Sequence, residues 1–251
     1  MTSDERSLSP AVNRAVAILD ELSLESPLGT SELARRLGLP KSSIANILGA
    51  MDQTGLIERV EQSYTLGRKL VELAGHYLAD HSAVSMFQSA AKSLPIASDE
   101  TIVFAELDDT EIIYLARHYG SQPIRLASDV GNRMPAVVTA LGQAMLSQLP
   151  PSELDDRLSR VETLPRLTSN SYTSFEELRK ALAQTAKRGH AIDDELNTEG
   201  VICFSVPLTK SDGSDRQFAV SVTMLKARHT PEHEALLVAD LHSLIEAMPL
   251  L

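Results

Sequence analysis

The side chains that could perform catalysis are few in this chain, and their spacing matches no common catalytic motif. The sequence has no glycine-rich phosphate loop, no Gly-x-Ser-x-Gly elbow and no His-Glu-x-x-His pair. His229 and His233 have the spacing of two metal ligands on a helix, but Thr230 and Pro231 predict that the helix begins between them. The single cysteine, Cys203, excludes an internal disulfide and a multi-cysteine zinc site. We therefore expect no enzyme, no metal and no cofactor.

A second set of residues points to nucleic acid. Residues 40–54 carry one apolar stripe at helical spacing, formed by Ile44, Ile47, Leu48 and Met51. The opposite face then carries only small or short polar residues, namely Ser42, Ala45, Asn46, Gly49 and Ala50. Small side chains let a helix backbone approach base pairs in the major groove, and the Asn46 amide can both donate to and accept from an adenine edge. This pattern predicts a recognition helix.

Hydroxyl and basic residues surround that helix where phosphate oxygens would lie. Free backbone amides at a helix N-terminus bind anions, and the residues expected there are Lys41, Ser42 and Ser43. Further candidates for phosphate contacts are Arg35, Arg36 and Arg59. The alternatives are that these residues form a solvated face, or that the module contacts other proteins instead of DNA.

The neighbouring elements predict a winged helix-turn-helix. Helices are expected from Ser9-Pro10 and over residues 30–37, and Gly55 ends the third helix. Two short strands around a polar turn follow at 56–60 and 64–67. We therefore expect a DNA-binding domain over residues 8–67, a linker helix over 68–80 and a second domain over 81–251.

The second domain is expected to be α+β. Strand patterns separated by turns or helices occur at residues 101–105, 112–115, 201–208 and 217–225. Helical patterns occur at 84–94, 136–149, 152–161 and 174–187, and after Thr230-Pro231. Strand pairs joined by tight turns favour an antiparallel sheet flanked by helices.

The charge of the chain is distributed unevenly. The net charge is −11, but the first 70 residues carry eight basic and nine acidic side chains, so nearly all the excess negative charge lies beyond them. This distribution permits DNA binding by the N-terminal module. No apolar run approaches the roughly 18 residues of a membrane span, and the polar first nine residues lack the plan of a signal peptide. We expect no membrane partner and a cytoplasmic location.

Several segments resemble the IclR family of transcriptional regulators. In the N-terminal half these are residues 30–43, TSELARRLGLPKSS, and residues 64–70, YTLGRKL. In the C-terminal half they are Met134-Pro135 followed by ALGQAML (140–146), and RGHAIDDE (188–195) followed by GVICFSVP (200–207). The match covers about residues 8–230, and both halves agree in order and spacing.

The resemblance implies a regulator, more often a repressor, of a catabolic operon. It implies binding of double-stranded operator DNA, dimers or tetramers, and a GAF-like effector-binding and oligomerisation domain over residues 81–251. The effector would be an organic or aromatic acid. The resemblance places its pocket at Leu126, Met134, Ala140, Leu141, Asp193, Cys203, Ser221 and Thr223. The alternative is an enzyme or a protein-interaction module built on the same fold.

Three residues depart from the family pattern. Asn46 stands where arginine is common in the recognition helix, which predicts a different operator sequence. Gln143 replaces the usual lysine of the central motif, and Ile202 stands where arginine is common. The last two departures remove positive charge and so weaken the expectation of an anionic effector.

The residue pattern alone does not decide whether these residues line a ligand pocket. Ser221 and Thr223 alternate with apolar residues, so a strand would place both hydroxyls on one face, toward either a ligand or solvent. Cys203, between two apolar residues, fits a small buried hydrophobic position. The acidic run that begins at Asp193 fits a ligand-contacting cluster or a solvated turn. A buried Asp193 would repel an anionic ligand unless it were protonated or bonded to ligand hydroxyls.

Overall fold

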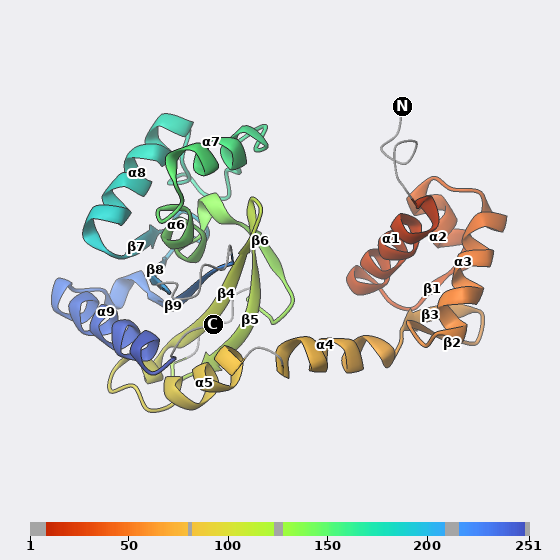
Figure 1. Ribbon diagram of the computed structural model, residues 1–251, viewed down its shortest axis with the longest axis horizontal. Coiled ribbons are helices and arrows are strands. Elements are labelled where there is room, and N and C mark those ends of the chain that lie inside the picture. Colours follow the sequence, from red (N-terminus) through yellow and green to blue (C-terminus); the bar gives the residue numbers. More distant parts are fainter. Residues whose placement is uncertain (1–8, 80–81, 123–127, 209–215, 249–251) are drawn as a thin grey trace. The chain divides into compact units, whose positions relative to one another are not determined.

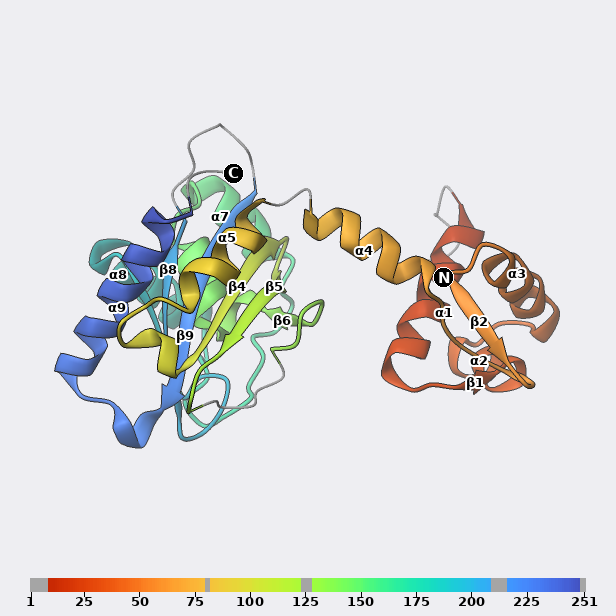
Figure 2. The same cartoon turned by 90° about the horizontal axis from the view of Figure 1, so that it is seen from below.

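The chain forms two compact units, Met1–Asp80 and His81–Leu251. The computed structural model describes residues 9–79, 82–122, 128–208 and 216–248. Figures 1 and 2 show a helix-rich N-terminal unit and a C-terminal unit built around a large sheet.

The N-terminal unit has the predicted winged helix-turn-helix plan. Its helices are α1 (Pro10–Leu24), α2 (Thr30–Leu37), α3 (Lys41–Gln53) and α4 (Lys69–Ala79). Its strands are β1 (Leu28–Gly29), β2 (Ile57–Val60) and β3 (Ser63–Leu66), in the order β1-β3-β2 with antiparallel neighbours. The β2–β3 hairpin follows α3 directly and forms the wing.

One apolar core holds α3 in place. Its most buried side chains come from α1, α2, α3 and β2, and are Ile18, Leu22, Leu33, Ile44, Leu48 and Ile57. Between α2 and α3 the chain turns at Gly38, whose φ of 64° lies in the left-handed region that glycine adopts without steric cost. The periodic apolar residues of the sequence therefore form the core that orients α3.

The C-terminal unit contains one six-stranded sheet. Its strands are β4 (Thr101–Asp108), β5 (Glu111–Tyr119), β6 (Arg133–Pro135), β7 (Ala191–Asp194), β8 (Val201–Pro207) and β9 (Gln217–Leu225). They lie in the order β6-β5-β4-β9-β8-β7, and every neighbouring pair is antiparallel. The expectation of an α+β domain with an antiparallel sheet is confirmed.

Helices cover both faces of this sheet, as Figures 1 and 2 show. One face carries α6 (Ala140–Leu146), α7 (Pro151–Ser159) and α8 (Phe175–Arg188), and the other carries α5 (Ser82–Ala91) and α9 (Pro231–Glu246). Alternate residues of each strand therefore enter different cores. Val103 packs under α6, whereas the ring of Phe104 stacks on Phe87 of α5 with 5.8 Å between centroids.

The stretch expected as one helix over residues 136–149 is divided. A 3-10 turn, η3 (Ala136–Val138), precedes α6, and the Thr139 hydroxyl between them accepts a hydrogen bond of 3.0 Å from the Gly142 amide. A β-carbon at Gly142 would lie 2.1 Å from the carbonyl oxygen of Ala136, so η3 packs directly on the glycine. The prediction of one continuous helix was wrong, because the apolar spacing continues through Thr139, which is the N-cap of α6.

Candidate functional site

The two faces of α3 are separated as predicted. Ile44, Leu48 and Met51 are buried, and Ile47 is half-buried. The outward residues are exposed, namely Lys41, Ser42, Ala45, Asn46 and Gly49. Since Ser42 and Asn46 both stand outside the core, the helix can present short polar groups and its own backbone to a groove.

The N-terminus of α3 carries a hydroxyl group and a cation in contact. Ser43 is half-buried, and its Oγ accepts a hydrogen bond of 3.2 Å from Nη1 of Arg14 on α1. Arg14 was not among the sequence candidates, because nothing in α1 alone indicates which helix it faces. Together with the exposed Lys41, it places positive charge beside the free amides of the first turn of α3.

The two adjacent arginines of α2 differ in their surroundings. The side chain of Arg35 is 72% exposed and, among the described residues, bonds to Glu32 alone, with Nε 2.9 Å from Oε2 and Nη2 2.5 Å from Oε1. The side chain of Arg36 is 23% exposed and contacts three carboxylates, those of Glu21, Glu25 and Glu32. Because two of these belong to the α1 segment, Arg36 ties α2 to α1, whereas Arg35 can turn toward a phosphate.

The wing and the outer edge of α3 carry the last two candidates. Arg59 on β2 is exposed, and its Nε donates to the backbone carbonyl of Glu61 at 3.0 Å. Asn46 lies at the rim of an apolar groove of about 420 Å³ that runs between α1 and α3, where Val12 and Ile47 form part of the wall. The Asn46 amide is therefore exposed at a boundary between a polar face and an apolar one.

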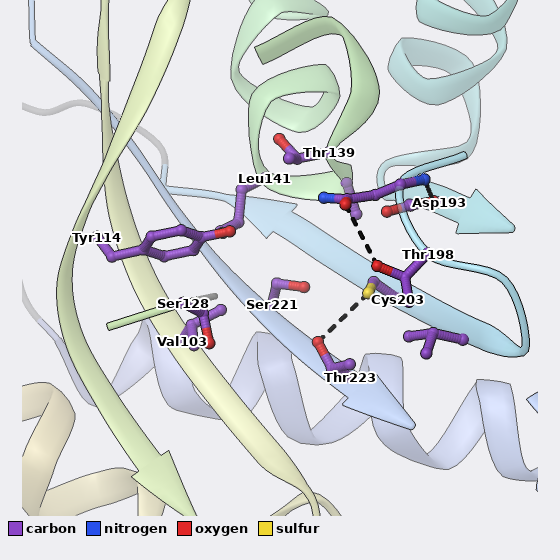
Figure 3. A pocket seen from close by; sticks show the side chains of 13 residues that line it. Val103, Tyr114, Ser128, Thr139, Leu141, Asp193, Thr198, Cys203, Ser221 and Thr223 are labelled. Carbon is purple, nitrogen blue, oxygen red and sulfur yellow. Dashed lines mark hydrogen bonds between the residues drawn. The ribbon is translucent and has the colours of Figure 1, made fainter. Parts of the chain in front are cut away.

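A small cavity lies between α6 and the sheet of the C-terminal unit. Figure 3 shows Thr139 and Leu141 from the α6 segment facing Ser221 and Thr223 on β9, with Tyr114 of β5 on one side and Asp193 of β7 on the other. Its volume is about 30 Å³, room for about two water molecules at roughly 10–15 Å³ each. A larger molecule could enter only if the wall moved apart.

Strand register explains why distant residues meet in this cavity. Asp193 pairs with Cys203, and Cys203 pairs with Thr223, so these three form one row across β7, β8 and β9. Val103 and Ser221 pair in the next row on the same face. Directly paired residues of antiparallel strands share a face, so this row brings hydroxyl, thiol and carboxyl groups together under α6.

Asp193 is the ionisable group whose pKa suits a binding role. It is 4% exposed, and its Oδ1 accepts hydrogen bonds from the backbone amides of Leu196 at 2.7 Å and Asn197 at 3.3 Å. Burial raises the pKa of Asp193 to about 7, although the two amide hydrogen bonds act in the opposite direction. Near neutral pH the carboxyl group can therefore either donate or accept a hydrogen bond.

The other two titratable groups in the wall stay neutral. Burial raises the pKa of the Cys203 thiol far above its ordinary value, and the thiol lies 3.3 Å from the Thr223 hydroxyl. Burial also raises the pKa of Tyr114, with smaller effects from Cys203 and Asp193. Cys203 is therefore a buried polar contact and not a reactive thiolate. The described residues that line the cavity include no lysine, arginine or histidine.

Six of the eight sequence-predicted effector residues line this one cavity. They are Ala140, Leu141, Asp193, Cys203, Ser221 and Thr223. Met134 on β6 is half-buried against the core under α6 and is not part of the wall. Leu126 lies outside the described residues.

The sequence candidates missed seven residues of the wall. These are Val103, Tyr114, Ser128, Thr139, Asn197, Thr198 and Val201. Alternation along β4 and β5 could have indicated Val103 and Tyr114, because each shares a sheet face with its paired neighbours. Asn197 and Thr198 carry no such signal, since the amide hydrogen bonds to Asp193 fold their loop over the cavity.

The two departures that remove positive charge lie outside the cavity wall. Ile202 pairs with Met224 and is buried on the opposite face of the sheet from Cys203. Gln143 is buried beneath α8, where its Oε1 accepts a hydrogen bond of 3.0 Å from the Tyr172 hydroxyl. The charge that these two departures remove therefore does not bear on a ligand bound in this cavity, and their effect on the effector stays a prediction.

No metal cluster is present within the described ranges: no three His, Cys, Asp or Glu side chains are arranged to hold an ion. His229 precedes α9, as its position before Thr230-Pro231 predicts, and its Nε2 lies 2.9 Å from a carboxylate oxygen of Glu234. Across the same ranges no helix combines the length and apolar character needed to cross a bilayer.

The chain is similar to known proteins over both units. A model of the IclR helix-turn-helix domain matches residues 11–61, and a model of the bacterial transcriptional regulator IclR C-terminal domain matches residues 75–248. The HTH-type transcriptional regulator KdgR of Escherichia coli K12 is 30% identical over 200 residues, covering 79% of this chain and 76% of that protein. The transcriptional repressor IclR of the same strain is 28% identical over 179 residues, covering 70% of this chain and 65% of that protein.

A solved structure shows the same fold. The IclR homologue of Microbacterium hydrocarbonoxydans, crystallised with 4-hydroxybenzoate, superposes with a TM-score of 0.79 at 22% identity and covers 95% of this chain and 98% of that one. Both units, their order and their internal plan thus agree with those of a single group of regulators. The chain therefore belongs to the IclR family of transcriptional regulators, with a helix-turn-helix domain and an effector-binding C-terminal domain, and it is a regulator and not an enzyme.

Proposed function

We propose that this protein is a cytoplasmic repressor of a catabolic operon, which binds its operator as a homo-oligomer and is released by an organic or aromatic acid. The observation that carries the proposal is the exposed face of α3, where Ser42, Ala45, Asn46 and Gly49 stand opposite the buried stripe. Such a face fits the major groove closely and offers one amide for base recognition. The similar Escherichia coli protein named as a transcriptional repressor supports the sign of regulation.

The chemistry of the small cavity supports an acid as the effector. A carboxylate ligand would meet Asp193 in a wall without a described cation, so it binds best when Asp193 carries a proton and donates a hydrogen bond to it. The hydroxyls of Ser221 and Thr223 supply further donors and acceptors. The 4-hydroxybenzoate in a relative with the same fold supports this class of ligand. At about 30 Å³ the cavity must widen to admit it.

Exposed apolar side chains of the N-terminal unit support subunit association. On α1, Val12 and Val16 are 59% and 51% exposed, and on α4, Leu73 and Tyr77 are 49% and 45% exposed. In each helix the two side chains lie four residues apart on one face, and exposed apolar surface of this kind marks an interaction site. A two-fold dimer would place its two recognition helices about 34 Å apart, one turn of DNA, and so match a palindromic operator. The helix over residues 68–80 would link the effector state to that spacing.

Operator binding is tested by selecting genomic fragments retained by the purified full chain and measuring affinity against salt concentration. We expect a palindromic site, and a steep linear fall of log affinity with log salt because phosphate contacts release counterions. Asn46→Ala is expected to lose preference at one base pair at a cost of about 1–3 kcal/mol. A DNA affinity that changed neither with salt concentration nor with DNA sequence would refute the proposed mode of operator recognition.

Effector control is tested with the selected fragment and a panel of carboxylates that includes 4-hydroxybenzoate. We expect the effector to lower operator affinity by at least ~5-fold, the lower range of allosteric coupling. Ser221→Ala is the matched variant, because it removes one cavity hydroxyl from a buried strand without changing α3. An effect of the acid that survives unchanged in variants of the cavity wall would place the effector elsewhere.

A further inference from the structure

A second hollow lies beside the effector cavity, between α8, β7 and the segment that carries Tyr172. Its volume is about 270 Å³, against about 30 Å³ for the effector cavity. The two walls share α6 and β7 but no residue: β7 contributes Asp193 to the cavity and Asp194 to the hollow. The hollow is therefore a separate space, and a polar one.

Two buried side chains in the wall have unused hydrogen-bonding capacity. Gln143 is 1% exposed, its Oε1 accepts from the Tyr172 hydroxyl, and its Nε2 makes a single long contact of 3.5 Å with the carbonyl of Val137. An amide nitrogen carries two hydrogens, so at least one is left for another partner. Thr185 is 3% exposed, and no group in the described chain bonds to its hydroxyl. Both side chains can therefore bond a ligand in the hollow.

Arg188 adds a positioned positive charge. Its Nε donates to the backbone carbonyl of His190 at 3.0 Å, and among the described residues no carboxylate pairs with its terminal nitrogens. Asp194 on the opposite side of the hollow is bound by Lys226 at 2.7 Å. Glu234 attracts the guanidinium from further away while it contacts His190 and His229. Arg188 is exposed, yet desolvation by the surrounding protein atoms lowers its pKa, and an anion at its terminal nitrogens would offset this effect.

We propose that this hollow is a second ligand site, which takes a small hydroxylated carboxylate with its carboxylate on Arg188 and its hydroxyls toward Gln143 and Thr185. The available groups are mainly donors, and such a ligand is rich in acceptor oxygens. Because Gln143 belongs to α6, whose Ala140 and Leu141 line the effector cavity, occupancy of the hollow alters effector affinity. Ligand binding in the hollow does not require the protein to bind DNA.

The test uses the full chain with D-gluconate, a carboxylate followed by a chain of hydroxyls, and with D-sorbitol as its neutral counterpart. Calorimetric titrations are run at ionic strength matched with chloride. We expect saturable binding of gluconate and none of sorbitol. Arg188→Gln should weaken gluconate binding at least about tenfold, because a charge-assisted hydrogen bond contributes ~1.5–3 kcal/mol. Thr185→Val, which keeps the side-chain shape, should weaken it less.

Ser221→Ala is the control, since it changes only the wall of the effector cavity. We expect it to leave gluconate affinity unchanged. Absence of saturable binding, equal binding by the Arg188→Gln variant, equal binding of sorbitol, or loss of gluconate binding in Ser221→Ala would each overturn the second site. Operator affinity without ligand is measured in parallel. A failure there refutes the proposed regulator function and leaves the gluconate result standing on its own.

Discussion

Neighbouring residues of one type have different roles in this protein, as Arg35 and Arg36 show. The sequence predicted a phosphate contact for both arginines, because both lie in the second helix of the helix-turn-helix. The fold does so, because α1 brings two further carboxylates to Arg36 and none to Arg35. Glu32 bonds to both, and these bonds hold the pKa of Glu32 at about 2, well below its ordinary value. Local sequence patterns therefore could not predict that Arg36 contacts carboxylates of another helix and that Arg35 does not.

Arg35→Gln and Arg36→Gln form a matched pair that separates DNA contact from stability. Arg35→Gln should reduce the slope of log operator affinity against log salt by about one, as expected for one lost phosphate contact. Arg36→Gln should lower the melting temperature of the N-terminal unit, because three carboxylates lose their shared partner. Salt titrations and thermal melts of both variants check this. A reversed pattern would assign the phosphate contact to Arg36.

Asp193→Asn should stabilise the protein more at pH 8 than at pH 5. The pKa of Asp193 rises from 3.8 to about 7 on folding, so the folded state binds this proton more tightly than the unfolded state. Stability is therefore lost as pH rises from about 4 to about 7, by at most about 4 kcal/mol. Asparagine keeps the oxygen that accepts from Leu196 and Asn197 but carries no charge. Urea unfolding of both proteins at the two pH values measures the difference; an equal gain at both would show that Asp193 titrates normally.

The same carboxyl group should make effector binding depend on pH. A carboxylate effector binds the protonated form of Asp193, so its affinity should fall as pH rises above about 7, approaching tenfold per pH unit. In Asp193→Asn the affinity should be nearly independent of pH over the same range. Titrations of the wild-type chain and the variant between pH 6 and pH 8.5 follow this. A pH dependence that persists in the variant would assign the proton to another group.

At the scale of elements, the sequence predicted the helices and strands in which the spacing of apolar residues is regular throughout. The stripe of α3, the wing hairpin and the strand pair β8–β9 all follow from spacing and turn residues. The start of α6 and the loop that carries Asn197 did not follow, because backbone amides that donate to the Thr139 hydroxyl and to the Asp193 carboxylate set them. The same division holds for the cavity: strand residues were predictable from alternation, and loop residues were not.

Gly142→Ala should disturb the segment that roofs the effector cavity. The added methyl group would lie 2.1 Å from the Ala136 carbonyl oxygen, so η3 must shift, at a cost of about 1–3 kcal/mol or more. We expect lower stability and loss of effector response, with operator binding retained. Gly75→Ala on α4 is the control, because its β-carbon meets nothing within 4 Å and should stabilise the helix by roughly 0.5–1 kcal/mol. Equal behaviour of the two variants would contradict the packing argument.

At the scale of the whole molecule, two units with different surfaces share one chain. The first 70 residues are nearly neutral and carry the helix-turn-helix domain, whereas most of the negative charge lies in the C-terminal unit. The small cavity and the second hollow of that unit both touch α6. Within the described part of the chain, apolar side chains are exposed on α1 and α4, and surface of this kind marks an interaction site.

Leu73→Glu should weaken the proposed dimer and, through it, operator binding. A charge placed in an apolar contact is destabilising because it loses water without gaining a partner. We expect a shift toward monomer in sedimentation velocity and a fall in operator affinity of roughly tenfold or more, about 1.4 kcal/mol, while effector affinity stays unchanged. Glu72→Gln, an exposed position on another face of α4, is the matched control. If Leu73→Glu remained dimeric and bound its operator normally, the subunit contact would have to use a surface other than this face of α4.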